Sequence, residues 1–229
     1  MSDEIRVSIH GQSFLLNAAK TAYWEEESIL LCSDLHWGRE AFLQSRGFPV
    51  PEGVFDEESF LLGKMIERYQ SRRVFVLGDL IHHPAGMHVE LRSKIRRWTE
   101  QYPKTEVRLI PGNHDRAINE WLPECGITLG DSAFISSGIR LCHEARAEKK
   151  TSGEFTWQGH QHPAIRIPEV SDYGKFPAFY VKKNIGYLPA FSQLAGGSEI
   201  KHFEAGDQIF AVSTDHIFAV PNRGSRRKD

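Results

Sequence analysis

Aspartate, asparagine and histidine side chains follow five short apolar runs of this chain, at the point where each run ends. The runs are SILLC, VFVLG, VRLIPG, IRLC and FTWQG. In layered α/β proteins, binding groups gather beyond the carboxyl ends of the strands. We therefore predict that the five segments converge on one site. Its candidate residues are, in chain order, Asp34, His36, Asp79, Asn113, His114, Asp115, His143, His160 and His162.

These side chains suit two divalent metal ions. A set of carboxylate, amide and imidazole groups without cysteine favours Mn, Fe, Zn or similar ions, and it is too rich in imidazole for calcium. Two metals about 3.5–4 Å apart clamp the attacking and leaving oxygens of a phosphoryl transfer and acidify a water, which can attack as hydroxide. The predicted ligands are Asp34, His36, Asp79 and His162 for one ion, and Asp79, Asn113, His143 and His160 for the other, with Asp79 as the bridge.

His114 is left over from the ligand set and is predicted to be the general acid. It lies beside Asn113, so its ring can face a substrate without binding a metal. A protonated imidazole at that place can donate a proton to the leaving oxygen. Asp115 is predicted to assist catalysis by fixing the tautomer of His114 and favouring its protonated form.

Strand-like and helix-like segments alternate through the middle of the chain. Short apolar segments at 28–34, 72–79 and 106–111 indicate buried strands. Between them, Asp56 is predicted to cap a helix that extends to Gln70, and a second helix is expected near 89–102. Residues 35–53 read as a long irregular stretch, and 117–126 as a short helix or turn. The first 25 residues indicate a hairpin that turns at Gly11, and the last 60 are rich in strands. This pattern predicts an α/β layered fold.

Composition is that of one soluble globular domain. The chain has 229 residues, of which 40% are hydrophobic and 25% are charged. We expect a single domain over residues 1–221, followed by a basic, disordered tail at 222–229. The net charge of −2 does not by itself indicate a nucleic-acid binder.

The sequence also excludes several classes of protein. It has no apolar run of about 18 residues, so no membrane span or membrane partner is expected. The first residues, MSDEIRVSIHGQ, lack the apolar core of a signal peptide. Three cysteines cannot all pair and have no zinc-finger spacing. A cytoplasmic location is therefore predicted.

The motifs SDLH, GDL, GNHD, LCHE and GHQH resemble, in order and in residue type, those of the calcineurin-like metallophosphoesterases. The resemblance extends from about Asp34 to His162. It implies a four-layer α/β fold in which two mixed β-sheets pack as a sandwich flanked by helices. It also implies a dinuclear metal centre, with the GNHD histidine, His114 here, at the leaving group.

Two longer stretches, YWEEESILLCSDLHWGREAFLQSRGFPVPEG and LPAFSQLAGGSEI, resemble the ligase-associated DNA damage response endonuclease branch of that family. This resemblance implies a phosphodiesterase or DNA endonuclease in repair, manganese as the metal, and DNA ligase and helicase partners. The chain departs from the branch at two places. Arg39 stands where the branch often has lysine, and HEA replaces the commoner HEP. Neither change removes a metal ligand.

The long loop after the first ligands has the composition of a single-strand binding surface. Arg39 and Arg46 lie among Trp37, Phe42 and Phe48. Bases stack on aromatic rings and phosphates pair with arginine, so both arginines are candidate contacts for single-stranded DNA. The same residues would also fit a loop whose aromatic rings pack inward and whose arginines are solvated. Of His82 and His83, which follow Asp79, one is expected behind the metal ligands and the other in solvent.

Two other functions stay open at the level of the sequence. A phosphodiesterase or phosphomonoesterase acting on a nucleotide or phospholipid intermediate would fit the slightly acidic charge. A non-catalytic metal-binding scaffold would have no need of a general acid, and the intact GNHD opposes it. Manganese is the expected metal, with Fe, Zn, Co and Ni as the other candidates.

Overall fold

The structure is a computed structural model that describes residues 2–115, 118, 120–145, 153–167 and 174–221. The tail at 222–229 lies outside the described residues. The boundary of a single domain at residue 221 stays a prediction.

The first sheet has seven strands in the order of the sequence. Neighbouring strands run antiparallel from β1 to β4 and parallel from β4 to β7. The hairpin of the first two strands turns at Gly11, as predicted. The strands are β1 (Glu4–Ile9), β2 (Gln12–Asn17), β3 (Ala22–Trp24), β4 (Ile29–Cys32), β5 (Arg73–Leu77), β6 (Glu106–Ile110) and β7 (Ile127–Leu129).

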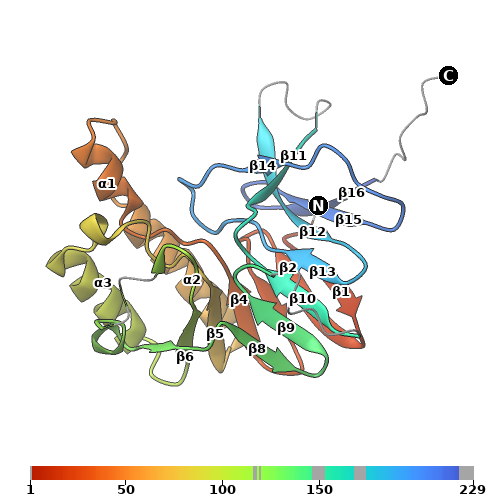
Figure 1. The fold of residues 1–229 in the computed structure, drawn as a ribbon, viewed down its shortest axis with the longest axis horizontal. Coiled ribbons are helices and arrows are strands. Elements are labelled where there is room, and N and C mark those ends of the chain that lie inside the picture. Colours follow the sequence, from red (N-terminus) through yellow and green to blue (C-terminus); the bar gives the residue numbers. More distant parts are fainter. Residues whose placement is uncertain (1, 116–117, 119, 146–152, 168–173, 222–229) are drawn as a thin grey trace.

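The second sheet has nine strands and is also mixed. Its central strands β9, β10 and β13 are parallel, and most of the others are antiparallel to their neighbours. The strands are β8 (Ala133–Ser136), β9 (Ile139–Cys142), β10 (Phe155–Gln158), β11 (Pro163–Arg166), β12 (Lys175–Val181), β13 (Ile185–Tyr187), β14 (Ser198–Glu199), β15 (Gln208–Val212) and β16 (Ile217–Val220). Figure 1 shows the two sheets side by side, with the helices beyond the first sheet.

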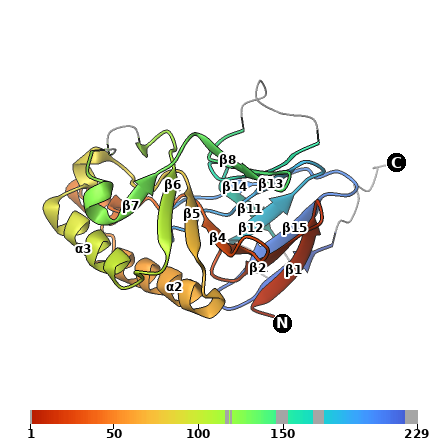
Figure 2. The ribbon, with the colours of Figure 1, turned by 90° about the horizontal axis from the view of Figure 1, so that it is seen from below.

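The described helices lie on the outer side of the first sheet, where Figure 2 shows α2 and α3 running past β4, β5 and β6. Helix α2 begins after Gly53 rather than after Asp56, because the left-handed backbone of Gly53 (φ 89°) ends the preceding loop. The predicted cap Asp56 lies instead in the first turn, where a carboxylate favours the helix dipole. The helices are α1 (Arg39–Ser45), α2 (Val54–Tyr69) and α3 (Val89–Glu100), with 3-10 turns η1 (Pro84–Gly86) and η3 (Pro123–Cys125).

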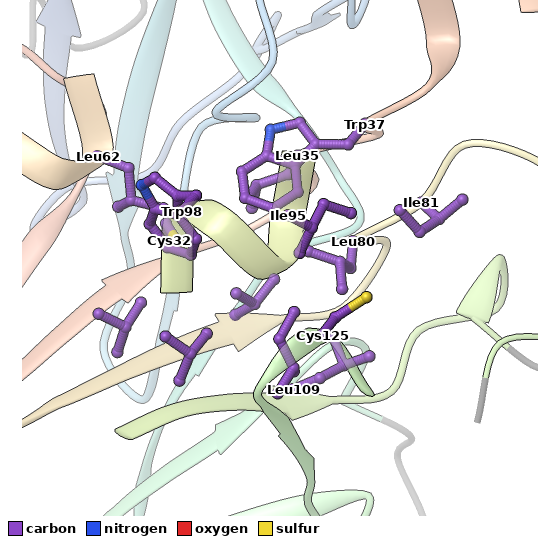
Figure 3. Close-up of a cluster of buried hydrophobic side chains, with 14 of the residues drawn as sticks. Cys32, Leu35, Trp37, Leu62, Leu80, Ile81, Ile95, Trp98, Leu109 and Cys125 are labelled. Carbon is purple, nitrogen blue, oxygen red and sulfur yellow. The ribbon is translucent and has the colours of Figure 1, made fainter. Parts of the chain in front are cut away.

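Alternating side chains of the first sheet fill two separate cores. Leu30 and Cys32 of β4 belong to the core under the helices, while Ile29 and Leu31 of the same strand belong to the core between the sheets. This alternation is the period of two that a strand buried on both faces requires. Figure 3 shows the core under the helices, in which Trp37 lies beside Leu35.

The architecture confirms the predicted fold class, a sandwich of two mixed sheets flanked by helices. The three cysteines, Cys32, Cys125 and Cys142, are buried and none is in a disulfide. Within the described part of the chain, no helix combines the length and apolar character needed to cross a bilayer.

Candidate metal centre

The predicted ligands meet at the carboxyl ends of strands from both sheets. Strands β4, β5 and β6 lie parallel in the first sheet, and β9 and β10 lie parallel in the second. Each strand therefore presents the residues that follow it at the same edge of its sheet. The sandwich brings the two edges together, and three groups of potential metal ligands form there, of which two consist of predicted ligands.

The first group consists of Asp34, His36 and His162, whose ligand atoms all lie within 4.8 Å of one another. The Nε2 of His162 is 3.1 Å from the Oδ1 of Asp34. Although burial raises the pKa of Asp34, the hydrogen bond and charge of His162 and the charge of His143 together lower it. The carboxylate is therefore held in the ionised form that binds a cation.

The second group consists of Asp79, His143 and His160, with ligand atoms equally close together. The Oδ1 of Asn113 lies 3.0 Å from the Nε2 of His143, which places the amide beside this group. Asp79 lies between the two groups, because its Oδ2 is 4.0 Å from the Nε2 of His36 and 3.5 Å from the Nε2 of His143. This is the position that a bridging carboxylate requires.

Partners outside the two groups set the direction of the imidazole rings. The Nδ1 of His143 lies 2.8 Å from the carbonyl oxygen of Leu77, and the Nδ1 of His162 lies 3.1 Å from that of Gly196. A ring that donates one N–H to a carbonyl keeps its other nitrogen unprotonated for a metal. His160 differs, because its Nε2 faces the carboxylate of Glu144 at 3.6 Å while its Nδ1 faces His143.

His36 gives an independent test of whether a metal fits here. Both ring nitrogens are buried, and neither has a hydrogen-bond partner among the described residues. Burial lowers the pKa of His36 to about 3, so the ring is neutral. A buried polar atom without a partner costs about 1–3 kcal/mol. A divalent ion bound to the ring would satisfy one of these nitrogens, so the residues present fit such an ion.

The backbone of the site is strained at five of the predicted ligands. A left-handed conformation is uncommon outside glycine, although aspartate and histidine adopt it more often than most residues, and residues of this kind cluster at functional sites. The strain turns each side chain sharply away from its strand and into the shared site. The residues with positive φ are Asp34 (55°), His36 (46°), Asp79 (51°), His160 (67°) and His162 (44°).

Two glycines of the motifs leave room for ligands that come from other strands. A Cβ on Gly78 would lie 2.2 Å from the Nδ1 of His143, and a Cβ on Gly112 would lie 2.3 Å from the Oδ1 of Asp79. Neither contact is sterically allowed. The glycines of GDL and GNHD are therefore required because a Cβ at either position would collide with His143 or Asp79.

His114 lies at the edge of the two groups, as predicted. Its Nε2 is 4.0 Å from the Oδ2 of Asp79, and its side chain is 37% exposed, so substrate can reach the ring. The Nδ1 of His114 lies 2.7 Å from the carbonyl oxygen of His82. That carbonyl, and not Asp115, orients the ring.

Asp115 therefore does not occupy the place that the sequence indicated. It is fully buried, and its carboxylate accepts hydrogen bonds from the backbone N–H groups of Asp79 and Gly112, both at 2.8 Å. Burial and the charge of Asp79 raise the pKa of Asp115 to about 6, although these N–H groups oppose the change. Asp115 thus holds the two loops of GDL and GNHD together beneath the site.

His82 is the residue that sequence reasoning left out. Its ring stacks on His114 with centroids 5.7 Å apart, and its nitrogen lies within 4.8 Å of those of His36 and His114. Burial and the neighbouring charge of Arg39 lower the pKa of His82 to about 4. The signal available in the sequence was its position three residues after Asp79.

The candidate substrate residues are only partly placed as expected. Trp37 is buried against Phe55 and Trp98 and presents no face to a base, which fits the alternative in which the aromatic rings of this loop pack inward. Arg39 lies near His82, and burial lowers its pKa. The guanidinium of Arg46 lies over the ring of Phe42, 5.3 Å from its centroid. The structure thus brings both arginines to the side of the site on which His82 lies.

Comparison with known proteins agrees with this geometry. Residues 27–205 match the family described as calcineurin-like phosphoesterases. The crystal structure of the Pseudomonas putida nuclease MPE is similar in fold, with a TM-score of 0.79 and 22% identity, and the match covers 95% of this chain and 100% of that one. A phosphoesterase from E. coli, Yfce, matches less well, with a TM-score of 0.45 and 15% identity over 84% of this chain and 97% of that one. No curated protein matches the chain in sequence.

Proposed function

Because the chain belongs to the calcineurin-like phosphoesterase family, we propose that it is a metal-dependent phosphodiesterase that cuts single-stranded DNA internally during repair. The chain is a phosphoester hydrolase with aspartate and histidine clusters that can bind divalent metals. The observation that carries the finer proposal is the combination of two ligand groups around Asp79 with an accessible His114 beside them.

Divalent metals would be held by the residues of the two ligand groups. Once bound, they would polarise the phosphoryl oxygens and lower the pKa of the attacking water. Manganese is the proposed metal because the family resemblance favours it, whereas the nitrogen and oxygen donors alone suit Fe, Zn, Co or Ni as well. Asn113, beside His143, is proposed as a further ligand in the second group.

His114 is proposed to protonate the leaving oxygen. The carbonyl of His82 accepts a hydrogen bond from the Nδ1 of His114, so in the imidazolium form of the ring the proton on Nε2 is the one available to substrate. The Nε2 lies on the metal side of the ring, 4.0 Å from Asp79. A phosphodiester bound between the ligand groups would therefore present its departing oxygen to this nitrogen.

A nucleic-acid substrate is supported by two observations. The structurally similar protein from Pseudomonas putida is described as a nuclease, and it is matched over its whole length. Arg39 and Arg46 lie on the same side of the site as His114, and arginine pairs well with phosphate. We accordingly propose that both arginines bind the DNA backbone, with a DNA ligase and a helicase as candidate partners in the cytoplasm.

The second candidate is a phosphodiesterase that acts on a small nucleotide or phospholipid intermediate. The net charge of −2 favours it, because a protein that binds long DNA usually carries a positive field. A single diester would also need only the metal centre and His114.

A Mn(II)-dependent cleavage assay separates the two candidates. Circular single-stranded DNA and bis-p-nitrophenyl phosphate are incubated with the protein in parallel, with and without EDTA. Nicking of the circle that requires metal supports the endonuclease. Hydrolysis of the aryl diester with intact circles would overturn it and favour the small-molecule enzyme.

A further inference from the structure

A series of aromatic rings leads from the metal centre to the surface of α1. The ring of His36 lies 5.4 Å from that of His82, and His82 lies 5.0 Å from Phe42. Phe42 in turn lies 5.0 Å from His83. The series begins at a metal ligand and ends at the half-buried Phe42 and the exposed His83, so it connects the reaction centre to solvent.

Positive charge accompanies this series. The guanidinium of Arg46 lies over Phe42, one helical turn further along α1, and Arg39 lies near His82. The Nε of Arg39 is buried and has no hydrogen-bond partner among the described residues. A phosphate oxygen on this side of the site could satisfy it.

The series lies on one defined side of the metal centre. His114 stacks on His82 and meets His36 edge-on at 5.3 Å, so the general acid and the ring series share the same side. A group that leaves the phosphorus toward His114 would then find His82, and Phe42 beyond it, on the same side of the site. In a nucleic acid, that group is a nucleotide with its base.

We propose that Phe42 stacks on the nucleobase of the departing nucleotide, while Arg46, whose guanidinium lies over the same ring, pairs with a phosphate of the strand. This inference rests on the proposed function and names a residue that determines its substrate class. Stacking on an aromatic ring tolerates any base, since every base has a π face. The result would be an enzyme selective for single strands without selectivity for sequence, because paired bases are not free to stack on the ring.

The test uses oligonucleotides that contain one cleavable phosphodiester, with methylphosphonates at all other linkages. One substrate carries all its bases, a second lacks the base on the departing side, and a third lacks the base on the opposite side. The ends of the products identify the departing side. Wild-type protein and Phe42→Ala are compared on all three substrates by kcat/KM, and the aryl diester reports the state of the metal centre.

Phe42→Ala is expected to lower kcat/KM on the complete substrate about tenfold or more, the usual effect of losing one base–aromatic stack. Removing the base on the departing side should lower the kcat/KM of wild type by the same factor. It should not lower the kcat/KM of Phe42→Ala any further. Phe42→Trp should restore cleavage and Phe42→Leu should not, because leucine retains apolar bulk without a π face.

Phe60→Ala is the matched control. Phe60 is 64% exposed on α2, and the Nζ of Lys64 lies 4.5 Å from the centroid of its ring. Phe60 and Lys64 therefore repeat the pair of a ring and a cation four residues apart that Phe42 and Arg46 form, on a helix that carries no predicted metal ligand. The Phe60→Ala variant should cleave all three substrates with the kcat/KM of wild type. The stacking proposal would be overturned if Phe42→Ala lowered kcat/KM by the same factor on the complete and base-free substrates. It would also be overturned if Phe42→Ala lowered kcat/KM on neither. Wild type that hydrolyses the aryl diester but cuts neither these oligonucleotides nor an unmodified single strand would instead contradict the proposed function itself.

Discussion

His143, His162 and His114 each turn one ring nitrogen to a backbone carbonyl and the other to the site. The carbonyls belong to Leu77, Gly196 and His82, so the backbone and not acidic side chains orients these rings. His160 is the exception and faces Glu144. Such outer partners fix which nitrogen can bind a metal or donate a proton. The chemistry of the centre thus depends on loop backbone positions as much as on the ligands.

His114→Ala should affect substrates according to their leaving groups. On an oligonucleotide, whose departing sugar oxygen needs a proton, kcat should fall about 10²- to 10⁴-fold. On bis-p-nitrophenyl phosphate the fall should be much smaller, because the aryl oxygen departs without protonation. His202→Ala, at an exposed histidine far from the motifs, serves as the control. Equal losses on both substrates would rule out a general acid at this position.

Gly112→Ala should remove the bridge between the two ligand groups. The new methyl would lie 2.3 Å from the Oδ1 and 2.6 Å from the backbone nitrogen of Asp79, so that carboxylate must move. We expect loss of one bound metal per chain by elemental analysis and at least about a 100-fold loss of activity, as for displaced reacting groups. Gly11→Ala meets no atom within 4 Å and strains only the left-handed hairpin turn between β1 and β2, so it should retain both metals. Full metal content in Gly112→Ala would contradict the steric account.

Most of the site was predictable because its residues directly follow apolar strands. Asp34 and Asp79 could be placed in this way without any knowledge of the sheet order. Asp115 and Trp37 could not, because adjacency in sequence does not say whether a side chain faces the substrate, the backbone or the core. For His82 and His83, the prediction of one residue behind the ligands and one in solvent holds, but no periodicity identifies His82 as the inward one.

The segment from Leu188 to Leu194 supports the metal centre from behind. Phe191 donates its N–H to the carbonyl of Ser33, and Ser192 to that of Asp34. The carboxylate of Glu58 in α2 accepts the N–H of Gln193 at 2.7 Å. The Nζ of Lys20 donates to the carbonyl of Phe191. A buried acid and a buried base thus hold this segment against the end of β4.

The acid of this pair should make stability depend on pH. Burial raises the pKa of Glu58 from 4.5 to about 7, although Gln193, Lys20 and Ser192 oppose this change; Glu40 adds to it. A raised pKa means that the folded state binds the proton more tightly than the unfolded state. The stabilisation that protonated Glu58 gives the folded state is therefore complete below pH 4.5 and is lost as the pH rises through about 7. This loss lowers the free energy of unfolding by at most about 3 kcal/mol.

Glu58→Gln keeps the acceptor for Gln193 and removes the titration. The free energy of unfolding of the metal-free variant should change less between pH 4.5 and 7 than that of wild type. Urea denaturation at several pH values measures this difference. Parallel curves for the two proteins would show that Glu58 does not titrate in this range.

The elements differ in how well sequence predicts them. Helix α3 has Leu91, Ile95 and Trp98 on one buried face, and this spacing identified it. Helix α1 has no fully buried residue and only seven residues, so residues 35–53 carried no helical signal. Its formation depends on tertiary contacts, including the pairing of Trp37 with Ile81 just before it.

At the scale of the whole molecule, each ligand group joins the two sheets. Asp34 and His36 follow a strand of the first sheet, and His162 follows a strand of the second. In the second group, Asp79 follows a strand of the first sheet and His143 follows a strand of the second. A bound ion therefore links the halves of the sandwich, and metal binding and folding are thermodynamically coupled.

Removal of metal should lower thermal stability. At a free metal concentration about 100 times Kd, binding stabilises the fold by about 2.7 kcal/mol per site. For a chain of this size, this corresponds to a Tm change of about 5–10 °C per site. Differential scanning calorimetry with EDTA and after addition of Mn(II) measures the shift. An unchanged Tm would mean that the sheets are not linked by metal.

The position of the metals is the most direct test of the whole account. Crystals of the manganese-loaded protein are measured at a wavelength at which manganese scatters anomalously. We expect two peaks about 3.5–4 Å apart, with the carboxylate of Asp79 between them. One peak would lie beside Asp34, His36 and His162, and the other beside His143 and His160. A single peak, or a peak at His36, His82 and His114 instead, would contradict the dinuclear centre.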